Sequence, residues 1–148
     1  MISLRKRQEG FTIVELLIVI VIIGILATLV IVTFTGTQQK ARNSQRQTDI
    51  NAINSHLASY YAENGSYPDV DDLADATWRS NNMKGLDDEA LVAPKGTIIT
   101  ATAGANNYGY AATPTGCGTD GDPEPCTGYT LTAHLEGGAP NFVKQSSN

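Results

Sequence analysis

The sequence predicts an α+β fold, in which a long amino-terminal helix packs against a small antiparallel β-sheet of three to four strands. Three observations predict it: an apolar run over residues 13–32, an amphipathic helical pattern that continues to residue 64, and short strand-like segments after residue 96. No proline occurs between Met1 and Tyr67, so nothing forces the helix to break. The 148 residues leave room for one domain and an appendage.

The apolar run has the length of a membrane-spanning helix, because about twenty helical residues span about 30 Å, the hydrocarbon thickness of a bilayer. A secretory signal has a shorter apolar region and an A-x-A-like cleavage site, and no such site follows this run. Arg5, Lys6 and Arg7 precede the run. The positive-inside rule therefore places residues 1–10 in the cytoplasm and the chain from about Gly36 outside.

Glu15 is the one ionisable residue within the apolar run. A carboxylate in a bilayer costs up to about 2.5–3.5 kcal/mol at the helix centre on insertion scales, and less near the ends. Two interpretations remain open from the residues alone. The carboxylate lies near the lipid headgroups at a helix N-terminus, which favours negative charge, or it awaits a cationic partner inside the membrane.

The segment GFTIVELLIV, residues 10–19, resembles the class III signal sequence of type IV prepilins and type II secretion pseudopilins. In that family a membrane peptidase cuts on the cytoplasmic side after the glycine and methylates the new amino-terminal phenylalanine. The resemblance therefore implies cleavage between Gly10 and Phe11, N-methylation of Phe11 and loss of the cytoplasmic leader 1–10. It covers residues 5–68 well, and the remainder only in general style.

The resemblance also implies how the chain assembles. Cleavage creates a positively charged amine on Phe11, and in the family the glutamate that corresponds to Glu15 is thought to pair with the amine of a neighbouring subunit. Residues 11–35 are then the transmembrane and assembly helix. The sequence departs from many major pilins at Val32, where they carry proline; the β-branched residues of 31–37 predict a nearly straight helix with a soft stretch.

Residues 36–64 are predicted to form an amphipathic helix that is the spine of the head. Apolar residues recur there at helical spacing, with charged residues between them. The pair Asn64-Gly65 suits a left-handed C-cap, and Pro68 follows it. The predicted apolar positions are Ala41, Ile50, Ile53, Leu57, Tyr60 and Tyr61.

Residues 65–148 are predicted to complete a globular α+β head. An irregular connection comes first, with short helical pieces at 71–75 and 87–92. Trp78 and Leu86 are expected to attach this connection to the long helix. The clearest strand is 129–135, where apolar and polar residues alternate. Gly137-Gly138 then predicts a turn. The other strand candidates are 97–102, 107–112 and 141–144.

Cys117 and Cys126 are the two cysteines, and both lie in the segment predicted to be exported. An even count at close spacing in such a segment predicts a disulfide, with two reduced thiols as the alternative. Closing a loop of about ten residues contributes roughly 2–3 kcal/mol in the chain-entropy model.

Charge is distributed unevenly along the chain. Residues 1–47 hold six basic and two acidic residues, a net charge of +4, whereas residues 48–148 hold four basic and thirteen acidic residues, a net charge of −9. So acidic a head repels phosphate backbones, and we expect no direct nucleic-acid binding from it.

Residue patterns that carry catalysis are absent from the sequence. His56 and His134 are the only histidines, both expected on polar surfaces, and no GxSxG, HExxH, P-loop or GxGxxG occurs. We therefore expect that the chain is not an enzyme and needs no cofactor.

Two acidic clusters are candidates for calcium, which prefers several oxygen ligands and is bound by the heads of some pseudopilins. One covers residues 69–75. The other consists of Asp120, Asp122 and Glu124 in the cysteine loop. Neither has the spacing of an EF-hand loop, so a solvated acidic loop is the preferred interpretation.

The resemblance favours a structural subunit of a type IV pilus, an extracellular filament for adhesion, motility or DNA uptake. It implies a single-pass precursor in the cytoplasmic membrane, and as partners other pilin subunits, the prepilin peptidase, an inner-membrane assembly platform with its ATPase, and membrane lipid before assembly. Two alternatives remain open. One is a pseudopilin of a type II secretion system, and the other is an unprocessed, single-span membrane-anchored binding module.

Overall fold

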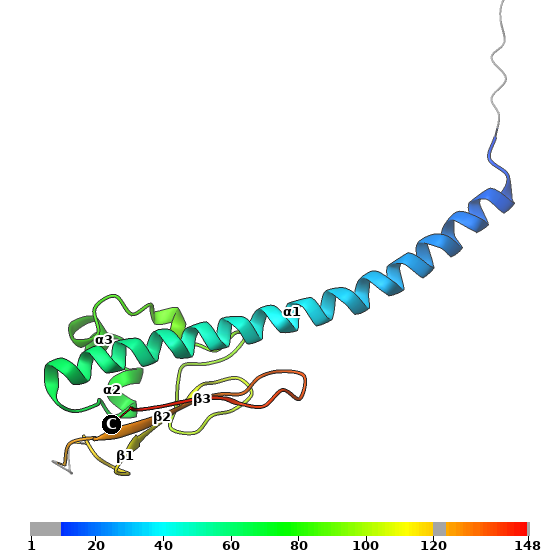
Figure 1. The fold of residues 1–148 in the computed structure, drawn as a ribbon. Helices are drawn as coiled ribbons and strands as arrows, with labels where there is room; N and C mark the ends of the chain where they lie inside the picture. Colours follow the sequence, from blue (N-terminus) through cyan, green and yellow to red (C-terminus); the bar gives the residue numbers. More distant parts are fainter. Residues whose placement is uncertain (1–9, 120–123, 148) are drawn as a thin grey trace, which may run out of the picture. The chain divides into compact units, whose positions relative to one another are not determined.

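A computed structural model describes residues 10–119 and 124–147. The chain divides into two units, Met1–Gln38 and Gln39–Asn148, and the long helix α1 runs through both (Figure 1). The elements confirm the predicted α+β class. In chain order they are α1 (Ile13–Asn64), α2 (Val70–Ala74), α3 (Ala76–Asn82), the 3-10 helix η1 (Asp88–Leu91), β1 (Gly109–Thr113), β2 (Gly128–Ala133) and β3 (Phe142–Gln145).

Helix α1 is uninterrupted through residues 31–37, the stretch rich in β-branched residues. Threonine hydroxyls in this region bond back to the preceding turn of the helix. Thr33 donates to the carbonyl of Leu29 at 2.9 Å, and Thr37 donates to the carbonyl of Thr33 at 3.0 Å. These hydroxyls are therefore satisfied without a partner outside the helix.

The predicted C-cap of α1 is confirmed. The helix ends at Asn64, and Gly65 takes the left-handed conformation with φ of 75°. The Gly65 N–H donates to the carbonyl of Tyr61 at 2.8 Å, and the Asn64 amide donates to that of Tyr60 at 2.9 Å. Both bonds satisfy carbonyl groups that a helix end leaves open.

Three short helices form the connection between α1 and the sheet, and an aspartate caps each of them. The carboxylates of Asp69, Asp75 and Asp87 accept backbone N–H bonds at 2.7, 2.7 and 3.0 Å at the starts of α2, α3 and η1. Helices α2 and η1 confirm the pieces predicted at 71–75 and 87–92. Helix α3 was not predicted, although Asp75, an N-cap residue type, was a signal for it.

The buried side chain of Arg79 joins these helices. Its Nε donates to Asp88 Oδ1 at 2.9 Å, and its Nη1 donates to the carbonyl of Leu73 at 2.9 Å. Trp78 packs on the helix as predicted, with its ring centroid 5.3 Å from that of Tyr60.

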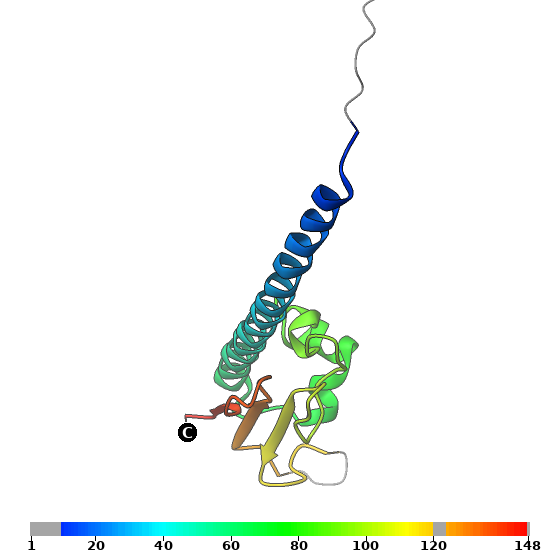
Figure 2. The ribbon, with the colours of Figure 1, turned by 90° about the vertical axis from the view of Figure 1, so that its right-hand side faces the viewer.

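The sheet has three antiparallel strands in the order β1-β2-β3. In Figure 2, α1 and the α2–α3 segment lie above the strands. Alternate residues of β2 are buried against them, namely Tyr129, Leu131 and Ala133, which confirms the predicted alternation. Gly137 and Gly138 form the predicted turn before β3, with φ of 81° and 74°.

The strand predicted at 97–102 is wrong. That segment forms only isolated bridges, Val92 with Ile98 and Thr100 with Gly109. The side-chain amide of Asn107 donates to the Thr100 hydroxyl and to the carbonyl of Thr102, both at 2.7 Å. These bonds hold 100–107 in a loop, and β1 therefore begins at Gly109, two residues later than predicted.

The head core lies between α1 and the sheet. Ile50, Ile53 and Leu57 are completely buried on α1 and pack against residues of the strands and the connection. Asp49 lies at the edge of this core, where its carboxylate accepts the Tyr108 hydroxyl at 2.7 Å. Burial raises the pKa of the Asp49 carboxyl, although this hydrogen bond acts in the opposite direction.

Candidate functional site

The first unit of the chain presents a continuous apolar helix surface. The described large apolar side chains from Phe11 to Phe34 are each between 51% and 91% exposed. Each side chain of this kind gains about 1.5–3 kcal/mol when it is fully buried. So large an exposed apolar surface indicates contact with lipid or with other protein chains.

Length and composition would allow α1 to cross a bilayer: its most apolar stretch has a mean hydropathy of 3.3. The described part of the chain contains no second helix that meets this criterion. None of this stretch is buried by other parts of the described chain, so its apolar side chains have no partner within the fold.

Thr12 and Glu15 cap the N-terminus of α1 through reciprocal hydrogen bonds. The Glu15 carboxylate accepts the Thr12 N–H at 2.9 Å and the Thr12 hydroxyl at 2.7 Å. The Thr12 hydroxyl in turn accepts the Glu15 N–H at 3.2 Å. This is a capping box, which satisfies N–H groups that the first helical turn leaves open.

The geometry bears on the two interpretations of Glu15, namely a carboxylate favoured by the helix N-terminus and a carboxylate that awaits a cationic partner. Its carboxylate lies in the first turn of α1, where the helix dipole favours negative charge. Glu15 is therefore hydrogen-bonded within its own chain, but both of its described donors come from Thr12. Thr12 was missed at the sequence level, although the pattern T-x-x-E at residues 12–15 is the signature of a capping box.

Gly10 and Phe11 precede the helix in non-helical, exposed backbone. The Phe11 side chain is 91% exposed, and no atom lies within 4 Å of a Cβ built on Gly10. A peptidase needs accessible, non-helical chain at the bond it cuts. The basic leader residues Arg5, Lys6 and Arg7 lie outside the described residues.

The two cysteines of the head form the predicted disulfide. The Cα atoms of Cys117 and Cys126 are 5.1 Å apart, and both side chains are buried. The Tyr67 N–H donates to the carbonyl of Cys126 at 2.9 Å, which ties the disulfide to the chain just after α1. The bridge thus joins Cys117 to the part of the head that Cys126 and Tyr67 form.

The acidic clusters considered for calcium are not assembled into a metal site in the part of the chain that the structure describes. That part holds no group of three or more His, Cys, Asp or Glu side chains that could hold a metal ion. Asp120 and Asp122 lie outside it, and Glu124 is exposed.

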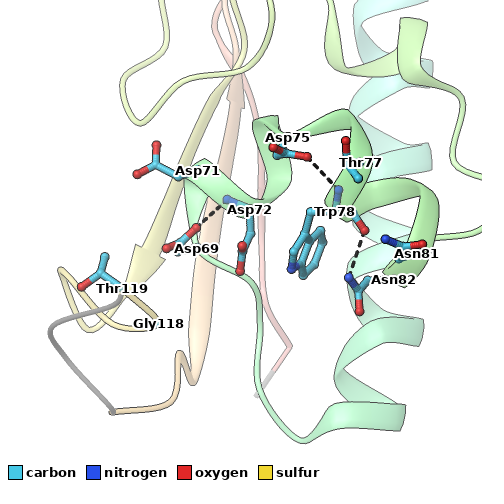
Figure 3. A pocket seen from close by; sticks show the side chains of 10 residues that line it. All are labelled: Asp69, Asp71, Asp72, Asp75, Thr77, Trp78, Asn81, Asn82, Gly118 and Thr119. Carbon is cyan, nitrogen blue, oxygen red and sulfur yellow. Dashed lines mark hydrogen bonds between the residues drawn. The ribbon is translucent and has the colours of Figure 1, made fainter.

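The other acidic cluster lines an open cavity of about 660 Å³ beside α2 and α3. Asp69 and Asp75 cap these helices, and their carboxylates are already bonded to backbone N–H groups. Figure 3 shows that the four aspartate side chains do not converge on one point. The remaining lining residues are Asp71, Asp72, Thr77, Trp78, Asn81, Asn82, Gly118 and Thr119.

The two histidines lie apart on different elements. His56 is half-buried on α1 and lines a cavity of about 250 Å³ with Glu63 and Lys84, whereas His134 is half-buried just after β2. The residues that the structure does bring together are Thr12 with Glu15, and Cys117 with Cys126.

Comparisons with known proteins identify the amino-terminal segment. Residues 5–31 match the family described as the prokaryotic N-terminal methylation motif. Type II secretion system core protein G of Aeromonas hydrophila is 40% identical over 72 residues, which are 49% of this chain and 50% of that protein. The protein of the same name from Dickeya chrysanthemi is 42% identical over 65 residues, 44% of this chain and 42% of the relative.

The chain spans about half the length of the curated relatives it matches. No solved structure matches it. The methylation motif covers most of the exposed apolar part of α1, including Glu15 in its first turn. The amino-terminal methylation motif and the similarity to type II secretion system core protein G both support the superfamily of type IV pilins and type II secretion pseudopilins.

Proposed function

We propose that the chain is a pseudopilin, a structural subunit that polymerises through α1 into the filament of a type II secretion system. One observation carries this proposal: the similarity to type II secretion system core protein G, which covers about half of the chain. The sequence alone favoured a type IV pilus subunit. The relatives support the alternative better, because those named here belong to secretion systems.

Processing is the first step of the proposed function. The precursor crosses the cytoplasmic membrane once, with its leader in the cytoplasm, and the prepilin peptidase cuts between Gly10 and Phe11 and methylates Phe11. The exposed, non-helical backbone at these two residues supports this step. The cut precedes the apolar helix, so the mature chain keeps it.

Assembly follows from the chemistry at the new amino terminus. The amine of Phe11 carries a positive charge, and the Glu15 carboxylate of a neighbouring copy supplies the opposite charge. In a low dielectric an unpaired charge is costly and a pair is much less so, so the pair selects register and neighbour. Glu15 already has Thr12 as a donor, so the approaching amine either adds to these bonds or replaces them.

Lateral packing provides the rest of the driving force. The apolar side chains between Phe11 and Phe34 face away from the helix on all sides, so copies can pack around it without burying charge other than Glu15. We propose the inner-membrane assembly platform and its ATPase as the machinery that moves subunits from lipid into the filament.

Deletion of the chain from its own cell tests the choice between the two filaments. The proposal predicts loss of secreted exoproteins, restored by the wild-type chain, with surface fibres unaffected. Retained secretion together with loss of long surface fibres made of this chain would refute the pseudopilin and favour the pilus.

A further inference from the structure

The first turns of α1 within the head, residues 39–46, are attached to the head through polar side chains. Among the described residues 39–49, only Arg46 and Asp49 are buried, and Ala41 is exposed. Buried apolar side chains on α1 begin at Ile50. The hydrophobic core therefore holds the helix from residue 50 onward, and a different kind of contact holds it before that.

That contact converges on Glu136, in the turn between β2 and β3. Arg42 donates to both of its carboxylate oxygens, with Nε at 2.7 Å from Oε1. The Asn43 side chain accepts the Glu136 N–H at 2.8 Å and donates to the Glu136 carbonyl at 3.1 Å. Arg46 Nη2 lies 3.7 Å from Oε1. We name Arg42, Asn43, Arg46 and Glu136 the Glu136 cluster.

Arg46 is the member of the cluster whose buried charge relies most on Glu136. Its side chain is 2% exposed, and its Nε and Nη1 have no hydrogen-bond partner among the described residues. Its remaining bond goes from Nη2 to the carbonyl of Ala105 at 3.0 Å. Glu136 forms an ion pair with this buried guanidinium, and the buried carboxyl of Asp49 also interacts with its charge, so loss of Glu136 leaves Arg46 with weaker compensation.

The turn itself is shaped to reach the helix. Gly137 has φ of 81°, and a Cβ placed there would lie 2.6 Å from Nε2 of Gln39. The turn therefore lies directly against α1, where backbone without a side chain fits best. Glu136 is held in place by this contact and by the two Asn43 bonds, which leaves its carboxylate free to bind arginine.

We propose that Glu136 is a positioning residue, which determines where α1 leaves the head. While its carboxylate is bound, residues 39–46 belong to the head. When this one side chain is removed, residues 39–46 keep the Asn43 bonds to the Glu136 backbone and the Arg46 bond to Ala105, but they open more often as a unit, and the core from Ile50 onward stays intact. This inference does not depend on the proposed function, because it concerns contacts within the head alone.

Hydrogen exchange measured by mass spectrometry on the full chain in detergent micelles tests the proposal. In Glu136→Gln we expect amides of residues 40–48 to exchange about two- to fivefold faster than in the wild type, because local opening no longer breaks the ion pairs. Amides of 50–57 and of β2 keep their wild-type rates. Glu89→Gln is the matched control, since it removes an exposed carboxylate from η1.

Arg42→Gln provides a second variant in case Glu136→Gln does not fold. It removes the bidentate pair but leaves Arg46 and Asn43 on Glu136, so we expect the same pattern at 40–48 with a smaller increase. The proposal is overturned if both variants exchange like Glu89→Gln at 40–48. It is equally overturned if residues 50–57 accelerate by the same factor, because Glu136 then supports the whole head.

Discussion

At the scale of single residues, the side chains that matter most are bonded to near neighbours in the sequence. The bonds between Thr12 and Glu15 join residues three apart, and the disulfide joins residues nine apart. Local spacing predicted the disulfide, whereas Glu15 was singled out by its charge within the apolar run, and its bonds to Thr12 were missed. The Glu136 cluster was not predicted, because its bonds join residues 93 and 94 positions apart.

Replacing Thr12 with valine removes the hydroxyl that bonds Glu15 in both directions and keeps the side chain's shape. Loss of a capping side chain costs about 0.5–2 kcal/mol, so we expect amides of the first turn, residues 13–18, to exchange about 2- to 30-fold faster. Thr28→Val is the control, since that hydroxyl bonds only the carbonyl of Ile25 inside the helix. Equal exchange in the two variants would contradict the role of the capping box.

The ion pair at Glu136 predicts a dependence of head stability on pH. The hydrogen bonds from Arg42, together with the charges of Arg42, Arg46 and Lys95, hold the pKa of Glu136 below its ordinary value of 4.5. Its contribution to the free energy of unfolding is therefore present above about pH 4.5, and it is lost as the pH falls through the lower, folded-state pKa.

Urea unfolding of the wild type and of Glu136→Gln at several pH values between 3 and 7 measures this contribution. We expect a difference of about 0.2–1 kcal/mol from the partly exposed pair near pH 7, and a shrinking difference below pH 4.5. A difference that stays constant down to pH 3 would show that the carboxylate charge is not what stabilises the head.

At the scale of elements, the predictions that were confirmed rest on local signals. The end of α1 at Asn64-Gly65 and the alternation in β2 need no knowledge of distant residues. The strand predicted at 97–102 is wrong because Asn107 bonds to Thr100 and Thr102, seven and five residues before it, and holds this segment in a loop. Helix α3 was missed because it is short, and because the buried Arg79 that anchors it bonds to Asp88 on η1.

Close packing in that loop makes Gly109, the first residue of β1, a sensitive position. A Cβ there would lie 2.5 Å from the backbone nitrogen of Ala103. We expect Gly109→Ala to lower the free energy of unfolding by about 1–3 kcal/mol, measured by urea titration with the fluorescence of Trp78. Gly36→Ala is the control, because a Cβ there meets open space in a helix and should stabilise it by about 0.5–1 kcal/mol. Equal urea midpoints for Gly109→Ala and Gly36→Ala would contradict the close approach of Gly109 to Ala103.

At the scale of the whole molecule, the two units of the chain differ in the side chains that they expose. Its first unit exposes apolar side chains, and its second unit carries an acidic, disulfide-linked head with a separate core. Composition and periodicity predicted this division, because each part is long enough to average over single residues. They could not choose between two kinds of filament, because the apolar helix suits both.

Glu15→Ala tests whether the carboxylate serves assembly rather than insertion. The substitution makes the segment more apolar, so we expect normal recovery of the chain in the membrane fraction. Filament yield, measured by cross-linking of neighbouring copies, should fall at least tenfold, because the new amine at Phe11 has no counter-charge. Glu63→Ala removes an exposed carboxylate near the end of α1 and serves as the control. Normal yield from Glu15→Ala would exclude this role.

Mass spectrometry of the mature amino terminus tests the central claim most directly, using the full chain purified from cells with an active prepilin peptidase. The account predicts a chain that begins at N-methylated Phe11, with residues 1–10 removed and Cys117 bonded to Cys126. A chain that still begins at Met1 would contradict it, and would instead support a membrane-anchored protein that is never processed or polymerised.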